Sequence, residues 1–174
     1  MAYRYRDSRQ DFILFGPQKE IRETEYGQDA NRVYYPGVST CTTLTLLLND
    51  NTLLGAHFAK PDPTRAVDAI VTELNNLRNN RPVTQLYLLG VLRLRDSSGW
   101  MQDDRYRWPQ LITTFNVAFG LTRGAMARGY VQQSGSDVHY RGDAIGNGVM
   151  AWYHKPTAVP LDQGKWEAVS LVNL

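Results

Sequence analysis

The chain has 174 residues, of which 43% are hydrophobic, and its formal net charge at pH 7 is +2. This length and apolar content predict one domain, residues 1–174, with a core of its own, and the small net charge gives no reason to expect nucleic acid as a partner. No run approaches the roughly 18 consecutive apolar residues of a membrane-spanning helix, so no membrane span is expected.

The N-terminus and the cysteine content bear on the compartment. The first ten residues, MAYRYRDSRQ, are charged and lack the apolar region of a secretory signal. The single cysteine excludes an internal disulfide, which favours a reducing compartment or a thiol with a chemical task. We therefore expect a soluble protein, and any export would use a route without a cleaved signal peptide.

The first part of the chain predicts short strands around a turn. Residues 1–32 are polar and charged apart from FILF, which predicts a short strand, and we expect the rest of this range to form a loosely packed or edge segment. The β-branched stretches RVYYPG and VSTCTTLTLLL predict strands. The cluster Asn49-Asp50-Asn51 predicts a turn, and TLLGAHFAK then predicts the returning strand of a hairpin.

The second part alternates helices with strands. The stretch DPTRAVDAIVTELNNLRNNRP predicts a helix with Thr64 as its N-cap and Pro82 beyond its end. Its apolar residues recur at helical spacing, at Ala66, Ile70, Leu74 and Leu77. VTQLYLLGVLRLR predicts one long central strand, DSSGWMQDDRYRW a loop, and Pro109 the start of a second helix. Further strands are expected at RGYVQQ, VHYRG, GVMAWYHK and WEAVSLVNL, with a turn at GDAIGNG. This order predicts an α+β fold, a mostly antiparallel sheet or sandwich with two flanking helices.

Cys41 and His57 are predicted to share one face of the hairpin. With a three-residue loop at 49–51, residues whose numbers sum to 100 are opposed, so His57 faces Thr43 and Cys41 faces Ala59. Opposed residues share a face, which makes Cys41 and His57 diagonal neighbours about 7–8 Å apart between Cα atoms. A loop of two or four residues would place them on opposite faces unless a bulge, for which Gly55 is a natural site, restored the parity.

A thiol beside an imidazole suggests a catalytic pair. The imidazole can take the proton of the thiol and leave a reactive thiolate, provided that the two groups meet at an open rim of the sheet. The small-residue run GVST before Cys41 can also direct backbone N–H groups toward a developing oxyanion. The alternative is that Cys41 only packs in the core, since cysteine is among the most buried residue types. A zinc site with His139 and His154 lacks any supporting ligand spacing, so no metal is expected.

The segment YYPGVSTCTTLTLLLNDNTLLGAHFAKP resembles the Cys–His protein-glutamine deamidase superfamily. This superfamily includes the chemoreceptor deamidases, the catalytic domains of the cytotoxic necrotizing factors and the Burkholderia lethal factor. Its cysteine closes a motif such as Leu-Ser-Gly-Cys at the start of a strand, and its histidine lies on the next strand. Here VSTC ends at Cys41, and His57 lies sixteen positions further on. The resemblance covers only this segment, and Thr40 stands where the motif has glycine.

The resemblance implies an α+β sandwich and a protein-glutamine deamidase without cofactor or metal. Cys41 would attack the side-chain carboxamide of a glutamine in a partner protein, and His57 would act as general base and acid. The third group, which orients the histidine, stays open: some members use a threonine six positions before the cysteine, where this chain has Tyr35, and others use a backbone carbonyl. The resemblance also suggests a bacterial effector or toxin, located in the bacterial cytoplasm or delivered into a target cell. Two alternatives remain: another Cys–His thiol enzyme, such as a protease or transglutaminase, and a non-catalytic protein-interaction domain.

Overall fold

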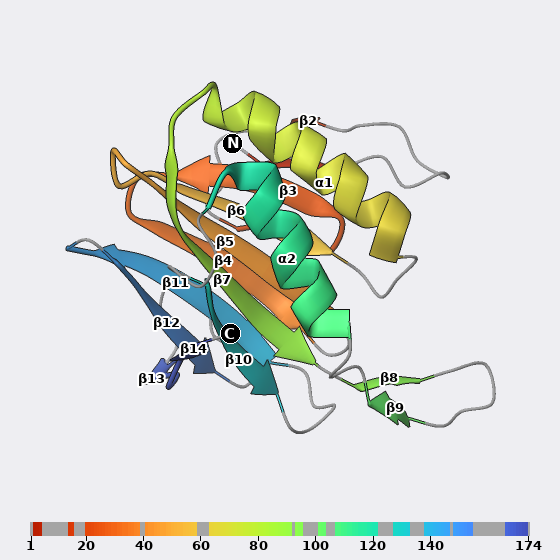
Figure 1. Cartoon of the computed structure of the whole chain (residues 1–174). Helices are drawn as coiled ribbons and strands as arrows, with labels where there is room; N and C mark the ends of the chain where they lie inside the picture. Colours follow the sequence, from red (N-terminus) through yellow and green to blue (C-terminus); the bar gives the residue numbers. More distant parts are fainter. Residues whose placement is uncertain are drawn as a thin grey trace.

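The computed structural model describes residues 2–4, 14–15, 20–38, 41–58, 63–91, 93–95, 101–103, 107–121, 127–132, 138–146, 148–154 and 166–173. These residues form three layers, in which two helices cover one face of an eight-stranded sheet and a four-stranded sheet lies on its other side (Figure 1). Among the named strands every pair is antiparallel except β7 with β10. The α+β fold class expected from the sequence is confirmed.

The larger sheet has the strand order β14-β10-β7-β5-β6-β3-β1-β2. Its strands are β1 (Ala2–Arg4), β2 (Leu14–Phe15), β3 (Glu25–Asp29), β5 (Thr42–Leu48), β6 (Leu53–Phe58), β7 (Val83–Val91), β10 (Ala127–Gln132) and β14 (Val172–Asn173). The smaller sheet has the order β13-β12-β11-β4 and consists of β4 (Arg32–Val38), β11 (Val138–Ile145), β12 (Gly148–His154) and β13 (Glu167–Ala168). A separate pair, β8 (Arg93–Arg95) and β9 (Met101–Asp103), projects away from the sandwich (Figure 1).

The helices α1 (Pro63–Arg78) and α2 (Arg107–Phe119) build one core against the larger sheet. Alternate residues of β5, β6 and β7 point toward the helices, and the helical repeat of α1 meets them; this core includes Leu44, Leu46, Leu54, Leu86, Leu88, Ile70, Leu74, Phe115 and Phe119. Each such side chain contributes about 1.5–3 kcal/mol when it is fully buried. α1 begins at Pro63, so Thr64 lies in its first turn and not at the N-cap position expected from the sequence.

A second core fills the space between the two sheets. It contains the other alternate residues of the central strands together with the inward side chains of the smaller sheet, among them Val33, Tyr35, Cys41, Leu47, Leu53, Tyr87, Leu89 and Tyr140. The backbone N–H of Val149 donates to the hydroxyl of Tyr87 over 3.0 Å, which joins β12 to β7 across this core. The central strands are therefore buried on both faces, as expected for the apolar stretch LYLLGV.

Three sequence-based expectations about strand limits are wrong. The strand expected over 83–95 ends at Val91, and Arg93–Arg95 pairs with β9 within the stretch 96–108 that was expected to be a loop. Arg93 and Arg95 would be costly to bury in a central strand, which explains why the strand of the larger sheet ends at Val91. The stretch expected to form one C-terminal strand instead forms β13 and β14, which belong to different sheets. The turn expected over 142–148 is shorter, because Gly142–Ile145 continue β11 and Gly146 turns with a φ of 58°.

Residues 1–32 contain both edge and interior parts. β1 and β2 lie at the edge of the larger sheet, whereas β3 pairs with β6 on one side and with β1 on the other. Ile21 and Tyr26 are buried in the inter-sheet core and the helix-side core respectively. Within the described residues, neither helix is long and apolar enough to cross a membrane.

Candidate functional site

The β5–β6 hairpin has the register that the sequence predicts. The loop spans Asn49–Asn51, the N–H of Leu48 donates to the carbonyl of Thr52 over 2.9 Å, and Thr43 is directly opposite His57. Asn51 closes the loop with a left-handed φ of 64°, a conformation that asparagine tolerates better than most residues. Gly55 forms no bulge, since it pairs in register with Thr45. The predicted partner of Cys41, Ala59, lies outside the described residues.

Cys41 and His57 therefore face the same side of the larger sheet. Cys41 immediately precedes β5 and belongs to the inter-sheet core, and His57 alternates along β6 with Leu53, which is also in that core. A close approach of β7 fixes the backbone at Cys41, because a Cβ at Gly90 would lie only 2.6 Å from the carbonyl oxygen of Cys41. The geometry brings the two residues to one end of the sandwich, as the sequence predicts.

The expected open rim is not found. The exposed fraction is 3% for Cys41 and 0% for His57. Nε2 of His57 has no hydrogen-bond partner in the described part of the chain, so the thiol of Cys41 does not bond to it. Both groups are closed in by the second sheet, which packs on this face of β5 and β6. Any reaction at the sulfur requires this end of the sandwich to open locally.

The ring of His57 is held in one orientation by a backbone carbonyl. Nδ1 lies 3.1 Å from the carbonyl oxygen of Ile21, and because a carbonyl can only accept, Nδ1 carries a proton. Burial lowers the pKa of His57 to about 4, and the hydrogen bond to Ile21 opposes this shift only in part. At neutral pH the ring is therefore uncharged, with its proton on Nδ1 and a lone pair on the unpartnered Nε2.

Tyr35 is not the group that orients this ring. The two rings meet edge to face, with centroids 6.2 Å apart and an interplanar angle of 85°. The hydroxyl of Tyr35 instead donates to the carbonyl of Leu44 over 3.0 Å and lies 2.7 Å from Oγ1 of Thr45. The orienting group left open by the sequence is the carbonyl of Ile21. No residue pattern could indicate it, since every residue has a carbonyl.

Two further buried polar residues flank His57 in the sheet. Glu25 is opposite His57 on β3, and Thr43 is opposite it on β5. The exposed fraction is 2% for Glu25 and 0% for Thr43. Oε2 of Glu25 accepts from the backbone N–H of Arg22 over 2.8 Å. No local sequence pattern singles out these residues, because they form a row with His57 only through the pairing of β3 with β6.

The other two histidines lie in the smaller sheet. His139 on β11 is directly opposite His154 on β12, and Nδ1 of His139 accepts from the backbone N–H of Gly37 over 2.9 Å. Across the described ranges, no group of three or more histidine, cysteine or acidic side chains is placed to hold a metal ion. The structure thus does not bring His139 to Cys41 and His57 as a metal site would require.

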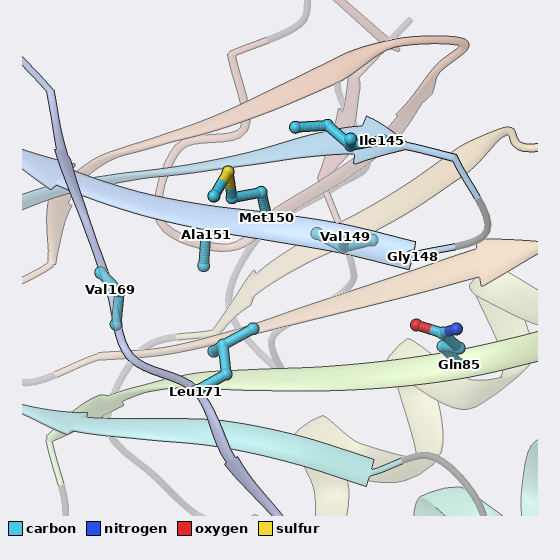
Figure 2. A pocket seen from close by; sticks show the side chains of 8 residues that line it. All are labelled: Gln85, Ile145, Gly148, Val149, Met150, Ala151, Val169 and Leu171. Atoms are coloured by element: carbon cyan, nitrogen blue, oxygen red, sulfur yellow. The ribbon is translucent and has the colours of Figure 1, made fainter.

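A pocket of about 480 Å³ lies between β12, the start of β7 and the segment at residues 169–171 (Figure 2). Gln85, near the start of β7, is paired with Leu47 at the far end of β5, whereas Gly90 is paired with Thr42 beside Cys41. The pocket is lined by Gln85, Ile145, Gly148, Val149, Met150, Ala151, Val169 and Leu171. Its position separates it from the thiol, so it is not the entry to the candidate site.

No protein-family model matches the chain, and no curated protein is detectably similar to it. The described residues form a three-layer α+β fold in which a buried thiol and a neutral, oriented imidazole share one face of the larger sheet.

Proposed function

We propose that the protein is a thiol-dependent amidohydrolase that converts a glutamine side chain of a partner protein to glutamate. Cys41 is the nucleophile, His57 is the general base and acid, and the carbonyl of Ile21 orients the imidazole. The proposal combines the resemblance of the segment around Cys41 with the geometry of the hairpin. An effector or toxin role, in the bacterial cytoplasm or in a target cell, belongs to the same proposal.

The observation that supports this proposal most directly is the tautomer of His57, with a proton on Nδ1 and a lone pair on Nε2. A general base needs a lone pair on a fixed nitrogen, and the bond from Nδ1 to the carbonyl of Ile21 leaves that lone pair on Nε2. An unpartnered ring nitrogen that is fully buried is costly unless it has a task or is satisfied at some stage of a reaction. The thiol of Cys41 lies on the same face of the hairpin as His57, which makes it a candidate to give its proton to Nε2 once this end of the sandwich opens.

The chemistry follows from these positions. The sulfur of Cys41 attacks the carboxamide carbon of glutamine while Nε2 of His57 takes the thiol proton. His57 then gives this proton to the leaving nitrogen, and ammonia departs to leave a thioester. Water attacks the thioester, His57 takes a proton from that water and returns it to the sulfur, and glutamate is released.

Burial determines the order of the proton transfer. With a pKa of about 4, the imidazole is a weak base, and a thiolate beside an imidazolium would be poorly solvated in this core. The proton therefore moves as the carbon–sulfur bond forms, without a pre-formed ion pair. This differs from the simplest expectation for a Cys–His pair, in which the thiolate exists before the substrate binds.

A second candidate is a non-catalytic interaction domain in which Cys41 is a packing residue. The observation that favours it is the burial of both side chains together with the lack of a bond between the thiol and Nε2. In that case His57 serves only to join β6 to the segment at Ile21 through its Nδ1 bond. Another Cys–His thiol enzyme would share Cys41 and His57 but would pass the acyl group elsewhere or cleave the chain.

Alkylation by iodoacetamide separates catalysis from packing. If the proposal holds, the folded protein is labelled at Cys41 near neutral pH as this end of the sandwich opens locally, and replacing His57 by asparagine slows this labelling because the base that takes the thiol proton during the attack is removed. His57→Asn is chosen because its amide N–H can still donate to Ile21 while the base is removed. If Cys41 is labelled only in denaturant, and equally in both proteins, the packing role is correct.

The reaction type is tested by incubating the protein with a cell lysate in ¹⁸O-labelled water. The proposed enzyme converts particular glutamines to glutamate with heavy oxygen in the new carboxylate, and Cys41→Ser does not. Spontaneous deamidation of asparagine, equal in both samples, serves as the internal control. Cleaved or cross-linked proteins that depend on Cys41 would instead indicate a protease or a transglutaminase, and no Cys41-dependent change would refute the enzyme.

A further inference from the structure

A short turn at residues 21–25 holds His57 from two sides. The carbonyl of Ile21 accepts the Nδ1 proton of His57, and the N–H of Thr24 donates to the backbone carbonyl of His57 over 2.7 Å. One turn thus fixes both the ring and the backbone of the same residue. Its conformation therefore decides which ring nitrogen of His57 is protonated.

The turn is closed by Glu25. The N–H of Glu25 donates to the carbonyl of Arg22 over 2.9 Å, and the carboxylate of Glu25 accepts from the N–H of Arg22 over 2.8 Å. These reciprocal bonds join the two ends of the turn. Because Arg22 directly follows Ile21, a bond to its N–H also sets the direction of the peptide that presents the carbonyl of Ile21.

The backbone of the turn is unfavourable without such support. Thr24 has a φ of 68°, in the left-handed region that a β-branched residue rarely adopts. A residue of this kind persists only where its surroundings determine the conformation, and such residues gather at functional sites. The buried carboxylate of Glu25, opposite His57 in the sheet, is one of the groups that supply this support.

We infer that Glu25 is a positioning residue for His57: by binding the N–H of Arg22 it holds the carbonyl of Ile21 against Nδ1 and so keeps the lone pair on Nε2. This inference rests on the proposed function for its purpose, but the geometry that it describes does not depend on activity. Glu25 acts through the turn and does not touch the reacting atoms.

The test is heteronuclear NMR of the imidazole nitrogens in the full chain, with the signals of His57 assigned by their loss in His57→Asn. In the unaltered protein we expect one tautomer near neutral pH, with Nδ1 protonated and Nε2 bare. Glu25→Met keeps the length of the side chain but removes the acceptor, and we expect it to give a mixture of both tautomers. Glu25→Gln retains an acceptor oxygen and should restore the single tautomer.

Two further variants make the result unambiguous. Glu25→Asp keeps the charge but shortens the reach to Arg22, so it should behave like Glu25→Met and can replace it if that variant does not fold. Glu73→Met is the matched control, because the carboxylate of Glu73 accepts from the hydroxyl of Tyr26 over 2.8 Å on the helix side of the same strand. The control should lower stability and leave the tautomer of His57 unchanged.

The outcomes separate this inference from the proposed function. A single Nδ1–H tautomer retained in both Glu25→Met and Glu25→Asp, with only stability reduced, would overturn the positioning role. If Cys41 is also alkylated in the native state, these variants should label about tenfold more slowly, the equivalent of one pKa unit at the base. If native labelling is absent in every protein but the tautomer changes as expected, the positioning role stands and the enzyme proposal fails.

Discussion

The carbonyl oxygen of Ile21 accepts a hydrogen bond from Nδ1 of His57, which lies 36 residues further along the chain. This bond and the burial of the ring act on the charge of His57 in opposite directions, and burial has the larger effect. Because a buried imidazolium would lack solvation, the folded state holds the ring neutral at pH values where the unfolded chain would protonate it. The stability of the protein is thereby linked to pH.

We predict that the free energy of unfolding decreases as the pH falls from about 6.5, the ordinary pKa of histidine, toward about 4, the pKa of His57 in the folded state. In this window the unfolded chain binds a proton that the native state does not, so acid favours unfolding by about 1.4 kcal/mol per pH unit. Below about pH 4 both states bind the proton and this contribution stops changing. Denaturant titrations at several pH values measure the slope.

The control for this prediction is His57→Asn, which keeps a donor for Ile21 but does not titrate in this range. It should have a smaller slope than the unaltered protein, because the other titrating groups are present in both proteins and only the contribution of His57 is removed. Equal slopes in the two proteins would mean that the pKa of His57 is the same in the folded and unfolded states.

The sequence predicted the hairpin register because the register depends on local chemistry. The three residues Asn49–Asn51 have strong turn preferences, and a loop of known length fixes every pair beyond it, including Thr43 with His57. Because opposed residues share a face, as do residues two apart on one strand, this register then sets the common face of Cys41 and His57. The helix around Ile70 and Leu74 was predictable for the same reason, since its apolar residues recur at helical spacing within one local segment.

What the sequence could not predict depends on how distant segments pair. The order of β3, β6 and β5 places Glu25 beside His57, and no local pattern encodes that neighbour. The burial of Cys41 likewise depends on the second sheet, whose strands come partly from residues 138–154. The separate deamidase resemblance concerned Cys41 and His57 alone, and it stays a prediction.

Gly55 provides a test of how the inter-sheet core packs against the β5–β6 hairpin. A Cβ at this position would lie 2.5 Å from Cδ1 of Ile21 and would also overlap Oη of Tyr35. We predict that Gly55→Ala lowers the free energy of unfolding by about 1–3 kcal/mol, the usual cost of overpacking a core. Equilibrium denaturation with fluorescence detection measures this loss.

The matched control is Gly142→Ala on β11, which also faces the inter-sheet core. A Cβ there would meet Val33 and Val149 at 3.5 Å, an ordinary van der Waals contact. This substitution should leave stability unchanged or raise it slightly, since alanine restricts the unfolded chain. A comparable loss in both variants would contradict the specific overlap at Gly55.

Gly90 provides a test of the backbone at Cys41. A Cβ at Gly90 would lie 2.6 Å from the carbonyl oxygen of Cys41 and 2.9 Å from Cα of Thr42, and these backbone atoms cannot rotate away. We therefore predict that Gly90→Ala displaces the segment at Cys41 and raises the rate at which a neutral maleimide labels the thiol in the native state. Mass spectrometry of the intact protein follows the labelling. A rate equal to that of Gly142→Ala would show that the two segments separate without exposing the sulfur.

Arg81 provides a test of the junction between α1 and the hairpin. Nε of Arg81 donates to the carbonyl of Arg78 over 2.8 Å and Nη2 to that of Leu77 over 3.1 Å, so the side chain satisfies carbonyls at the C-terminus of the helix. The same guanidinium bonds Asp50 over 3.0 Å and Gln28 over 3.1 Å. We predict that Arg81→Lys lowers the free energy of unfolding by about 1–3 kcal/mol, because an ammonium group cannot reach these acceptors together.

The control for Arg81 is Arg22→Lys. The side chain of Arg22 is 66% exposed and pairs with Glu20 over 2.9 Å, and an exposed ion pair of this kind contributes little to stability. Denaturant unfolding should therefore show a change close to zero for Arg22→Lys. Added salt should abolish most of any difference at Arg22 but leave most of the loss at Arg81, since bonds to helix carbonyls do not depend on a second charge. Equal losses in the two variants would mean that Arg81 contributes only its charge.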